Sequence, residues 1–399
     1  MILYNSSRFS TLPGAMVFQP SCLLSFPSSV EVGDLWLNGG CGIGNGSSSI
    51  KAGLGEYFER RHFYMEVNAD VRGTLSYSLT SEEVEGFVGA FSQTNESGLK
   101  KSEIFGHVFN LTRAYRASNF TECHIPTACV SLNYNNIESE NFIYPLRDTC
   151  GCSFHWRFSD AIFGALKECL ERQFLAKFWL TKDCVRIVPI PEAKASLKES
   201  GSSALLEALD KSGEVTIIDI SDYGFPGVCL LTVYGQKNIG RHVQYCAGMS
   251  YAKNQLEAME KSLYELWQTY RFVDLFHATK GRMEDIEDSY LRYFLSCNSY
   301  SVYEEIIDVK KKSECSSVSS DGFDWCGLLG VLKARNIDGF FYVNSTDISG
   351  ELYFFCKFVS PDMFLHMNNS EGINLVNKYS RSFTGEIIDL RRRVMVPFP

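Results

Sequence analysis

The amino-acid sequence predicts a mixed α/β fold of the α+β kind, in which helices pack on β-sheet. Two observations support this fold class. Helical stretches alternate with short apolar runs typical of strands along the whole chain. The 399 residues, 45% of them hydrophobic, also provide enough apolar side chains for a large buried core. We expect an N-terminal segment at residues 1–40 and one domain at residues 41–399.

Three long helices are expected, near residues 48–63, 160–180 and 253–272. A glycine-rich stretch at 39–49 precedes the first of them and is predicted as a loop, with Ser48 or Ser49 as the N-cap of the helix. This loop lacks the Gly-Lys-Ser/Thr of a P-loop.

Strands are expected between these helices. Apolar runs favour strands in HIPTACVSL and FIYPL, and later in VRIVPI, EVTIIDI, VCLLTVYG, FFYVNS and LYFFCKFV. The polar stretch at 309–322 is predicted as a surface loop, and residues 391–399 form a tail.

Composition excludes several classes of protein. The balance of 38 basic against 47 acidic residues gives a net charge of −9, which argues against a nucleic-acid binder. The N-terminus does not have the pattern of a signal peptide, and no apolar run approaches the roughly 20 residues that span a bilayer. We therefore expect a cytoplasmic protein without membrane contact.

The chain has 14 cysteines and no CxxC pair, so most are predicted to be reduced core residues. Cys150, Cys152 and His155 form the one cluster. The pattern leaves open metal binding, a nucleophilic thiol, and a tight loop packed against the core.

The three predicted helices share one pattern. Each has small residues seven and three positions before a glutamate, a leucine two before it, and a second carboxylate or an amide three after it. The matching residues are Ser49, Gly53, Leu54, Glu56 and Glu59; Ala161, Ala165, Leu166, Glu168 and Glu171; and Ala258, Ser262, Leu263, Glu265 and Gln268.

This pattern places acidic pairs beside packed seams. Residues three apart share a helix face, and small residues allow another backbone to approach. Carboxylates at such a seam are destabilised by desolvation and repulsion unless a cation binds them. Because Mg²⁺ prefers carboxylates together with phosphate oxygens, the pairs indicate an ATP site without a P-loop. A solvated helix surface is the alternative reading.

Basic residues lie next to the acidic pairs. Arg60 and Lys261 are predicted to contact phosphate oxygens, whereas Arg61 and Lys167 are predicted to form ion pairs within their helices.

The ordered patterns ExxER, ExxE and ExxQ resemble the ATP-binding signature of the YcaO family. The resemblance implies an ATP-dependent cyclodehydratase that turns Cys and Ser or Thr residues of a ribosomal precursor peptide into thiazolines and oxazolines. It assigns to Mg²⁺ and ATP the side chains of Glu56, Glu59, Glu168, Glu171, Glu265 and Gln268.

The family resemblance also implies partners and a role for the tail. The expected partners are a precursor peptide with a leader, a leader-binding protein related to ubiquitin-activating enzymes, and an FMN-dependent dehydrogenase. The proline-rich tail is expected to reach the active site, where the terminal carboxylate of Pro399 would accept a proton.

The sequence departs from the family pattern at three positions. Ala52 replaces a serine, Gln173 stands where an aspartate often occurs, and Met395 replaces a proline of the tail. Asp362, His366 and Asn368 are expected either to line a peptide channel or to stabilise local structure.

Three other functions remain possible from the sequence. The same nucleotide site could serve thioamide formation or amidine formation, in which the activated amide meets a different nucleophile. The chain could also be a non-catalytic scaffold with a structural ATP site.

Overall fold

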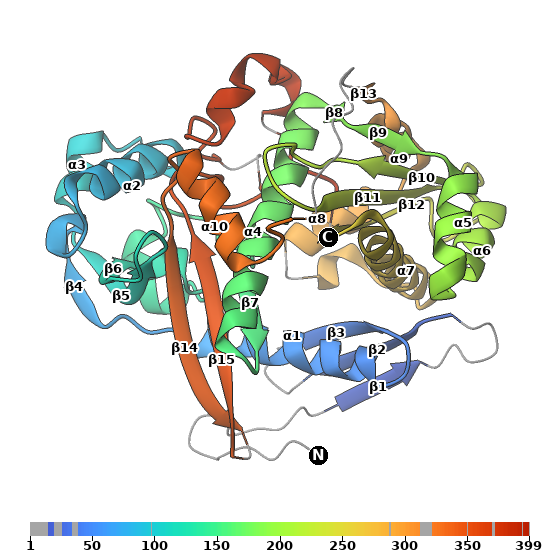
Figure 1. The fold of residues 1–399 in the computed structure, drawn as a ribbon, viewed down its shortest axis with the longest axis horizontal. Helices are drawn as coiled ribbons and strands as arrows, with labels where there is room; N and C mark the ends of the chain where they lie inside the picture. The colour runs from blue at the N-terminus through green and yellow to red at the C-terminus, as the bar shows by residue number, and fades with distance from the viewer. Residues whose placement is uncertain are drawn as a thin grey trace.

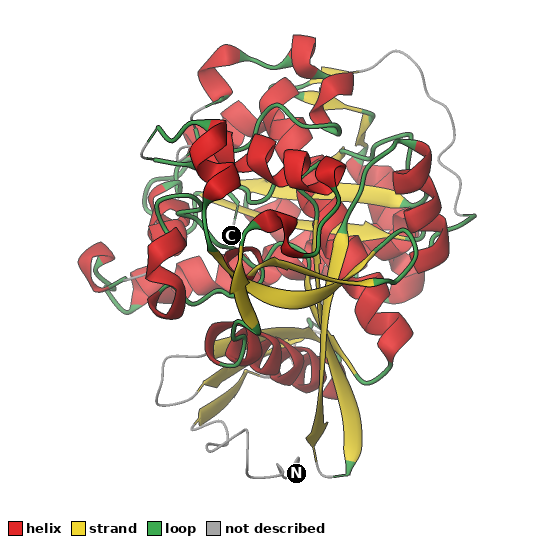
Figure 2. Cartoon of the chain, turned by 90° about the vertical axis from the view of Figure 1, so that its left-hand side faces the viewer, coloured by secondary structure: helices red, strands yellow, loops and turns green. Residues whose placement is uncertain are grey.

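Helices and sheets are mixed throughout the computed structural model, as the sequence predicts (Figures 1 and 2). The structure describes residues 15–19, 26–33, 39–96, 98–286, 289–311, 321–348, 350–368, 372–392 and 394–398. Among the described helices, none combines the length and apolar character of a bilayer-spanning segment.

The first sheet carries helix α1. Strands β1 (Ala15–Gln19), β2 (Ser28–Gly33) and β3 (Gly39–Gly44) pair antiparallel in this order, and α1 (Ser47–Met65) packs across β3.

Glycines on β3 make this packing possible. A Cβ atom at Gly42 would lie 2.0 Å from the carbonyl oxygen of Ser49, and one at Gly40 would lie 2.3 Å from that of Gly53. Any side chain at these positions would push α1 away from the sheet.

A four-stranded antiparallel sheet carries helix α7 in the same way. Its order is β12 (Tyr245–Ala252), β11 (Val228–Gly235), β10 (Glu214–Asp219) and β9 (Arg186–Val188). Helix α7 (Gln255–Ala278) begins after Asn254, whose side chain accepts a hydrogen bond from the Glu257 N–H at 3.0 Å. A Cβ atom at Gly248 of β12 would lie 2.1 Å from the Leu266 nitrogen of α7.

The two units therefore repeat one supersecondary motif. In each, a pair of antiparallel strands leads into a helix, and a strand glycine touches the helix backbone. Gly40 contacts Gly53 in the first unit, and Gly248 contacts Ser262 in the second. The motif places the first glutamates of α1 and α7 in equivalent positions.

The six-stranded sheet and helix α4 complete the framework. The sheet order is β4 (Val71–Gly73), β5 (Phe109–Arg116), β14 (Phe340–Ile348), β15 (Glu351–Val359) and β7 (Cys152–His155), with β6 (Glu122–Pro126) paired to β5. Helix α4 (Phe158–Thr181) follows β7, packs on β7 and β15, and also touches β12. It thus lies between the two larger sheets (Figure 1).

Shorter elements cover this framework. The remaining helices are α2 (Ser81–Thr94), α3 (Lys101–Gly106), α5 (Ile190–Ser200), α6 (Ser203–Ser212), α8 (Ser289–Ser296), α9 (Tyr300–Ile307) and α10 (Trp325–Ala334). Strands β8 (Asp183–Cys184) and β13 (Lys310–Lys311) pair in parallel. Single 3₁₀ turns occur at Leu75–Tyr77, Thr127–Cys129, Met283–Asp285, Ser380–Ser382, Thr384–Glu386 and Asp389–Arg391, and Asn135–Glu140 is two 3₁₀ turns joined by a kink at Ile137.

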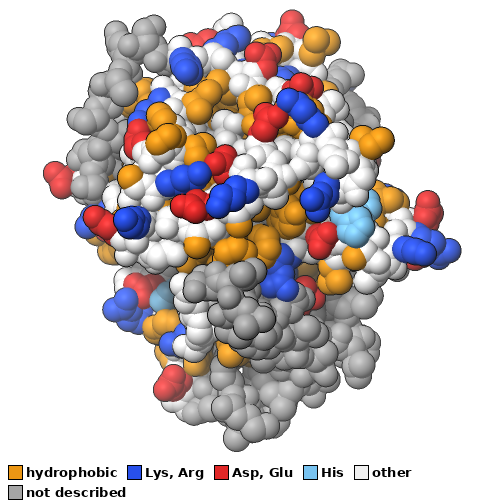
Figure 3. Space-filling view, turned by 90° about the vertical axis from the view of Figure 1, so that its right-hand side faces the viewer, with side chains coloured by type: hydrophobic (Ala, Val, Ile, Leu, Met, Phe, Trp, Pro, Cys, Tyr) orange, Lys and Arg blue, Asp and Glu red, His pale blue; other side chains and the backbone are white. Residues whose placement is uncertain are grey.

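The core consists of two apolar clusters. One surrounds α4, α7 and the four-stranded sheet, and the other lies between α1, α2 and the six-stranded sheet. Ten of the 12 described cysteines are buried, and all 12 are unbridged, as predicted for most of them. The surface seen in Figure 3 has Lys and Arg side chains interspersed with Asp and Glu.

Several local predictions were wrong. The stretch predicted as a loop at 39–49 contains strand β3, because its glycines serve close packing rather than flexibility. The N-cap of α1 is Gly46, with φ 59°, and not Ser48 or Ser49, whose hydroxyls donate to the carbonyls of Asn45 and Gly46.

Two strand predictions and one loop prediction also need correction. FIYPL is a turn with Ile143 and Tyr144 buried, in which the N–H groups of these two residues bond to the Glu140 carbonyl, and HIPTACVSL leaves the strand after Pro126. Their apolar side chains fill the core from irregular backbone, which a short apolar run does not distinguish from a strand. In the predicted loop at 309–322, residues 310–311 form β13, and residues 312–320 lie outside the described part.

We predict that Gly248→Ala destabilises the protein by about 2–3 kcal/mol, because the new methyl group would overlap the backbone of α7. The midpoint of urea-induced unfolding measures the effect. Gly330→Ala in α10 is the control, since no atom lies within 4 Å of its added Cβ. An equal midpoint for Gly248→Ala and the wild type would show that α7 does not depend on this close approach.

Candidate functional site

Helices α1, α4 and α7 turn their glutamates toward a common region. The small residues before each first glutamate are buried, as the sequence pattern predicts: Ser49, Gly53, Ala161, Ala165, Ala258 and Ser262. The acidic side chains at the ends of these faces form one group, which we call the acidic cluster: Glu56, Glu59, Glu168, Glu171 and Glu265.

Backbone N–H groups of the strands hold three members of the acidic cluster. The Cys41 N–H of β3 donates to Glu56 Oε2 at 2.7 Å, and the Met249 N–H of β12 donates to Glu265 Oε2 at 2.8 Å. Glu171 Oε2 accepts from the Tyr251 N–H at 2.5 Å. These bonds fix one oxygen of each carboxylate. Sequence reasoning did not find these N–H donors, because side-chain patterns contain no signal for them.

The sixth predicted ligand, Gln268, lies where α7 meets β3. Its side chain hydrogen-bonds to the thiol of Cys41. Burial, with Glu56 adding to it, raises the pKa of this thiol to about 12, so Cys41 stays protonated.

The acidic cluster is desolvated and its members repel one another. Burial raises the pKa of Glu59 to about 8, and the charges of Glu168 and Glu56 add to the effect. Burial and the charge of Glu171 raise the pKa of Glu265 to about 8. Burial also raises the pKa of Glu171. Carboxylates that are desolvated and repel one another are stabilised when a cation binds to them.

Basic side chains balance only part of the negative charge. Arg60 pairs with Glu56 at 2.6 Å, Arg172 pairs with Glu168 at 3.0 Å, and Lys167 pairs with Glu171 at 3.3 Å. When all five carboxylates are ionised, as they would be with a cation bound, five carboxylates against three cations leave 5 − 3 = 2 negative charges. The ion pair predicted for Lys167 is confirmed.

The described ion pair of Lys261 is with a residue outside the acidic cluster. Lys261 is exposed, lies one turn before Glu265, and pairs with Glu257 at 2.7 Å. Arg61, predicted to form an ion pair in its helix, is buried and donates to the sulfur of Met65.

The acidic cluster suits Mg²⁺ bound together with phosphate. In the described part of the chain, no three Cys, His, Asp or Glu side chains are grouped to hold a metal ion by themselves. Mg²⁺ usually takes one or two carboxylates and completes its coordination with water and phosphate oxygens. The oxygen donors and their excess charge therefore fit Mg²⁺ that arrives with a polyphosphate.

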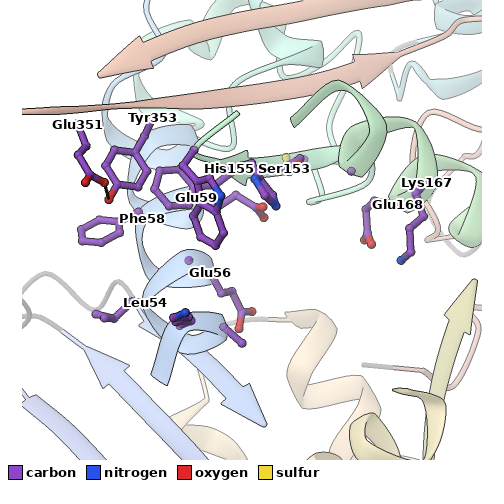
Figure 4. Close-up of a pocket in the computed structure, with 17 residues that line it drawn as sticks. Leu54, Glu56, Phe58, Glu59, Ser153, His155, Lys167, Glu168, Glu351 and Tyr353 are labelled. Atoms are coloured by element: carbon purple, nitrogen blue, oxygen red, sulfur yellow. Dashed lines mark hydrogen bonds between the residues drawn. The ribbon is translucent and has the colours of Figure 1, made fainter. Parts of the chain in front are cut away.

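A cavity of about 720 Å³ opens beside the acidic cluster (Figure 4). Glu56, Glu59 and Glu168 line one part of it. Aromatic side chains line another part: Phe58, Phe154, Trp156 and Tyr353. Its size and mixed polarity are typical of a small-molecule site.

Other cavity residues were missed or left open by the sequence analysis. Lys51, Ser153, Glu351 and Tyr353 line the cavity but lie outside the ExxE patterns, and Glu351 and Tyr353 are also far from them in sequence, so no spacing marks them. Ala52, the departure from the family serine, lines it too.

The cluster of Cys150, Cys152 and His155 is a turn and a strand. Gly151 has φ 74°, and β7 starts at Cys152. Cys152 and His155 line the cavity, while burial and a hydrogen bond with Cys169 raise the pKa of Cys150. A nucleophilic thiol is not favoured by these surroundings.

Asp362 and His366 lie away from the cavity. Asp362 pairs with Lys378 at 2.9 Å beside a second cavity of about 420 Å³. His366 is buried, and its Nδ1 accepts from the N–H of Asn368.

The C-terminal tail runs into the core. Side chains hold three of its carbonyl oxygens: Trp179 Nε1 donates to Val394 at 2.7 Å, Tyr293 to Met395 at 2.7 Å, and Tyr245 to Pro397 at 2.6 Å. The Phe398 ring is buried and lies 5.7 Å from the guanidinium carbon of Arg172, the partner of Glu168. Pro399, the predicted proton acceptor, lies outside the described residues.

Known proteins resemble the whole chain. The family described as YcaO cyclodehydratase, ATP- and Mg²⁺-binding, matches residues 40–363. The Microcin B17-processing protein McbD of Escherichia coli is 34% identical over 416 aligned positions, which cover 100% of both chains.

Solved structures agree with this relationship. A chain of the E. coli microcin synthetase McbBCD complex with pro-MccB17 bound matches with a TM-score of 0.87 and 34% identity over 100% of both chains. A heterocyclase in complex with substrate and cofactor matches with a TM-score of 0.70 at 13% identity, covering 96% of this chain and 55% of that one. The second likeness shows the fold alone.

We predict that stability without Mg²⁺ and ATP falls as the pH rises from about 4.5 to about 8. Glu59 and Glu265 bind protons up to about pH 8 in the folded state but ordinarily only up to 4.5 when unfolded, so the folded state is favoured at the acidic end. The free energy of urea unfolding should be lower at about pH 8 than at about pH 5 by several kcal/mol, since each of the two groups contributes roughly 3 kcal/mol over this interval.

Three measurements test whether the acidic cluster causes this slope, which is the dependence of stability on pH. Glu59→Gln should reduce it, whereas Glu207→Gln, on the exposed side of α6, should leave it unchanged. Mg²⁺ with a non-hydrolysable ATP analogue should also reduce it. A slope of the same size in Glu59→Gln would show that repulsion in the acidic cluster is not its source.

Proposed function

The chain belongs to the YcaO family of ATP- and Mg²⁺-binding cyclodehydratases, and we propose that it is the ring-forming subunit of a synthetase for a microcin B17-like peptide antibiotic. The observation that carries this proposal is the identity of 34% with McbD over the full length of both chains. The substrate is a ribosomal precursor peptide. Its Cys and Ser or Thr residues become thiazolines and oxazolines.

The reaction requires a better leaving group than an amide oxygen. The thiol or hydroxyl attacks the preceding carbonyl carbon, and the oxygen of that carbonyl must then depart. ATP, when bound with Mg²⁺, supplies the phosphoryl group that lets this oxygen leave as phosphate. The protein contributes positioning and neutralisation of charge rather than a covalent nucleophile.

We assign the six predicted side chains to Mg²⁺ and ATP: Glu56, Glu59, Glu168, Glu171, Glu265 and Gln268. Support comes from the convergence of the five carboxylates, their excess negative charge and their position beside the cavity. Arg60 contacts a phosphate oxygen in this proposal, since its partner Glu56 lines the cavity. A phosphate contact by Lys261 stays a prediction, because its described ion pair is with Glu257.

The tail supplies a proton acceptor. The carbonyl contacts of Val394, Met395 and Pro397 and the packing of Phe398 on Arg172 support a fixed path toward the acidic cluster. Burial would raise the pKa of the terminal carboxylate of Pro399 above its ordinary value of about 3.5 and make it a better base.

The enzyme works with other proteins in the cytoplasm. The related structure is a complex of three kinds of subunit with a peptide bound. We propose a leader-binding partner related to ubiquitin-activating enzymes, which delivers the peptide, and an FMN-dependent dehydrogenase, which oxidises the rings to thiazoles and oxazoles. The domain that does this work extends over residues 41–399.

We predict that Glu59→Gln lowers the rate of ring formation by on the order of 10²-fold, because one charge that positions the phosphates is lost. Mass spectrometry of a Cys- and Ser-rich precursor, incubated with the partners, Mg²⁺ and ATP, counts one lost water per ring. Release of ADP and phosphate is followed in parallel. Glu207→Gln is the matched control, since it removes an exposed carboxylate.

The products separate the alternatives. Loss of water matched by consumption of ATP, with the lost water assigned to Cys or Ser residues by fragmentation of the peptide, supports the cyclodehydratase. A gain in mass that matches replacement of oxygen by sulfur, or a macrocyclic amidine in the product, would show that a different nucleophile attacks the activated amide. If no ATP is consumed with all partners present, the chain is a non-catalytic scaffold and the proposal is wrong.

We further predict that a carboxamide in place of the terminal carboxylate of Pro399 lowers the rate by about 10²-fold or more, because the base is lost while the prolines remain. Semisynthesis with a C-terminal prolinamide provides the protein, and a semisynthetic protein with the free carboxylate is the control. Equal rates for the two would remove Pro399 from the mechanism.

A further inference from the structure

Ring formation releases two protons from the peptide. One comes from the thiol or hydroxyl that attacks, and the other from the backbone N–H that becomes a C=N bond. A single base next to the acidic cluster would have to serve both positions, which lie on different atoms of the forming ring. The structure offers a second candidate on the other side of the cavity.

We propose that His155, oriented by Asp160, is the general base that takes the proton of the attacking thiol or hydroxyl. This inference rests on the proposed function. It leaves the N–H proton to the tail.

The fold directs the His155 ring toward α4 and the cavity. Successive side chains of a strand point to opposite faces, so Ser153 and His155 of β7 share one face. A Cβ atom at Gly164 of α4 would lie 2.3 Å from the Ser153 hydroxyl, so this face packs on α4. His155 lines the cavity, and Figure 4 shows it with Glu59 and Glu168 in the space between α1 and α4.

The Asp160 carboxylate lies next to the imidazole. Its Oδ2 lies 3.3 Å from Nδ1 of His155 and also accepts a hydrogen bond from Arg157 at 2.6 Å. Nδ1 is buried and makes no hydrogen bond to the described residues of this structure, although the Asp160 carboxylate lies close to it. A hydrogen bond from Nδ1 to this carboxylate would leave Nε2 as the nitrogen that meets a substrate. A base that is oriented by a third group is the arrangement that nucleophilic reactions commonly use.

The position along α4 suits the chemistry. Asp160 and Glu168 are eight residues apart, which is about 12 Å along a helix axis. Arg172, on which Phe398 packs, lies about 6 Å further along the axis. The acidic cluster thus lies between His155 and the tail.

The distances expected between reacting groups agree with a base that lies outside the acidic cluster. A Mg²⁺–oxygen bond is about 2 Å, and reacting atoms approach to about 3 Å. A base lies about 3 Å from the proton donor. A base for the nucleophile is therefore expected several ångströms from the glutamates rather than among them.

The environment keeps His155 neutral near pH 7. Burial lowers its pKa from the ordinary value of 6.5, the carboxylate of Asp160 opposes this shift, and Arg157 adds to it. The other charged groups that face the same cavity are Lys51, Glu56, Glu59, Lys167, Glu168 and Glu351. Of the seven histidines in the chain, His155 is the one that lines this cavity in its described part.

The step is balanced in protons. As the S–H or O–H bond breaks, the electron pair forms the bond to the carbonyl carbon, and the proton passes to Nε2. The departing phosphate then accepts that proton, which returns the imidazole to its neutral form. The oxygen of the lost water ends in the phosphate.

Substitution of His155 tests the proposal in the complete complex with its partners. His155→Gln should lower kcat for ring formation by about 10²–10⁴-fold. The affinity for Mg²⁺ with a non-hydrolysable ATP analogue, measured by calorimetry, should stay within twofold. In wild type, kcat should fall below the pKa of His155, where the base is protonated, and this acidic limb should disappear in His155→Gln.

Further variants guard against a structural explanation. His242→Gln is the matched control, since His242 also pairs with an aspartate, Asp274, but is exposed outside the cavity. Added imidazole should partly restore kcat in His155→Ala, which a merely structural role would not allow. Asp160→Asn should lower kcat less than His155→Gln does.

The outcomes distinguish failure of the His155 assignment from failure of the proposed function. An unchanged kcat in His155→Gln, or a weaker affinity for the ATP analogue with kcat preserved, overturns the assignment of His155 while wild-type ring formation still supports the proposed function. Absence of rings in wild type overturns both.

Discussion

The convergence of five carboxylates, of which Glu59, Glu171 and Glu265 are desolvated, is the constraint on which the rest of the structure depends. Burial and like charge raise the pKa values of Glu59 and Glu265 to about 8, so the cluster opposes folding near neutral pH. The surrounding fold must offset this cost in the absence of Mg²⁺ and ATP. The cluster is stable because three helices and two sheets hold it from different sides.

Backbone geometry provides much of this support. The N–H groups of Cys41, Met249 and Tyr251 each donate to one glutamate and fix its orientation. The donors from Cys41 and Met249 reach Glu56 and Glu265 because glycines at 40, 42 and 248 let α1 and α7 lie directly against their strands. The close packing of small residues and the orientation of the acidic cluster are therefore one structural feature.

Helix α4 connects the separate parts of the site. It contacts β7 and β15 of one sheet and β12 of another. Its first turn holds Asp160 beside His155, its middle carries Glu168, and Arg172 contacts Phe398 of the tail. One rigid helix thus sets the spacing between the cavity, the acidic cluster and the C-terminal segment.

The sequence by itself determined the elements that follow a regular period. The three glutamate helices, their buried small residues and most later strands could be predicted, because helical spacing places residues such as Ala161, Ala165 and Glu168 on one side. The ordered acidic pairs also sufficed to indicate the family and its Mg²⁺–ATP chemistry.

Only the tertiary structure decided which groups meet. The glycine-rich stretch at 39–44 became a strand because β2 pairs with it and α1 packs on it, and the composition of the stretch itself indicates neither contact. The aromatic wall of the cavity joins Phe58, Phe154 and Tyr353 from three distant segments. The N–H donors and the His155–Asp160 contact depend on how strands and helices approach one another. The sequence period fixes the face on which a side chain lies, whereas the partner across the interface is fixed by long-range packing.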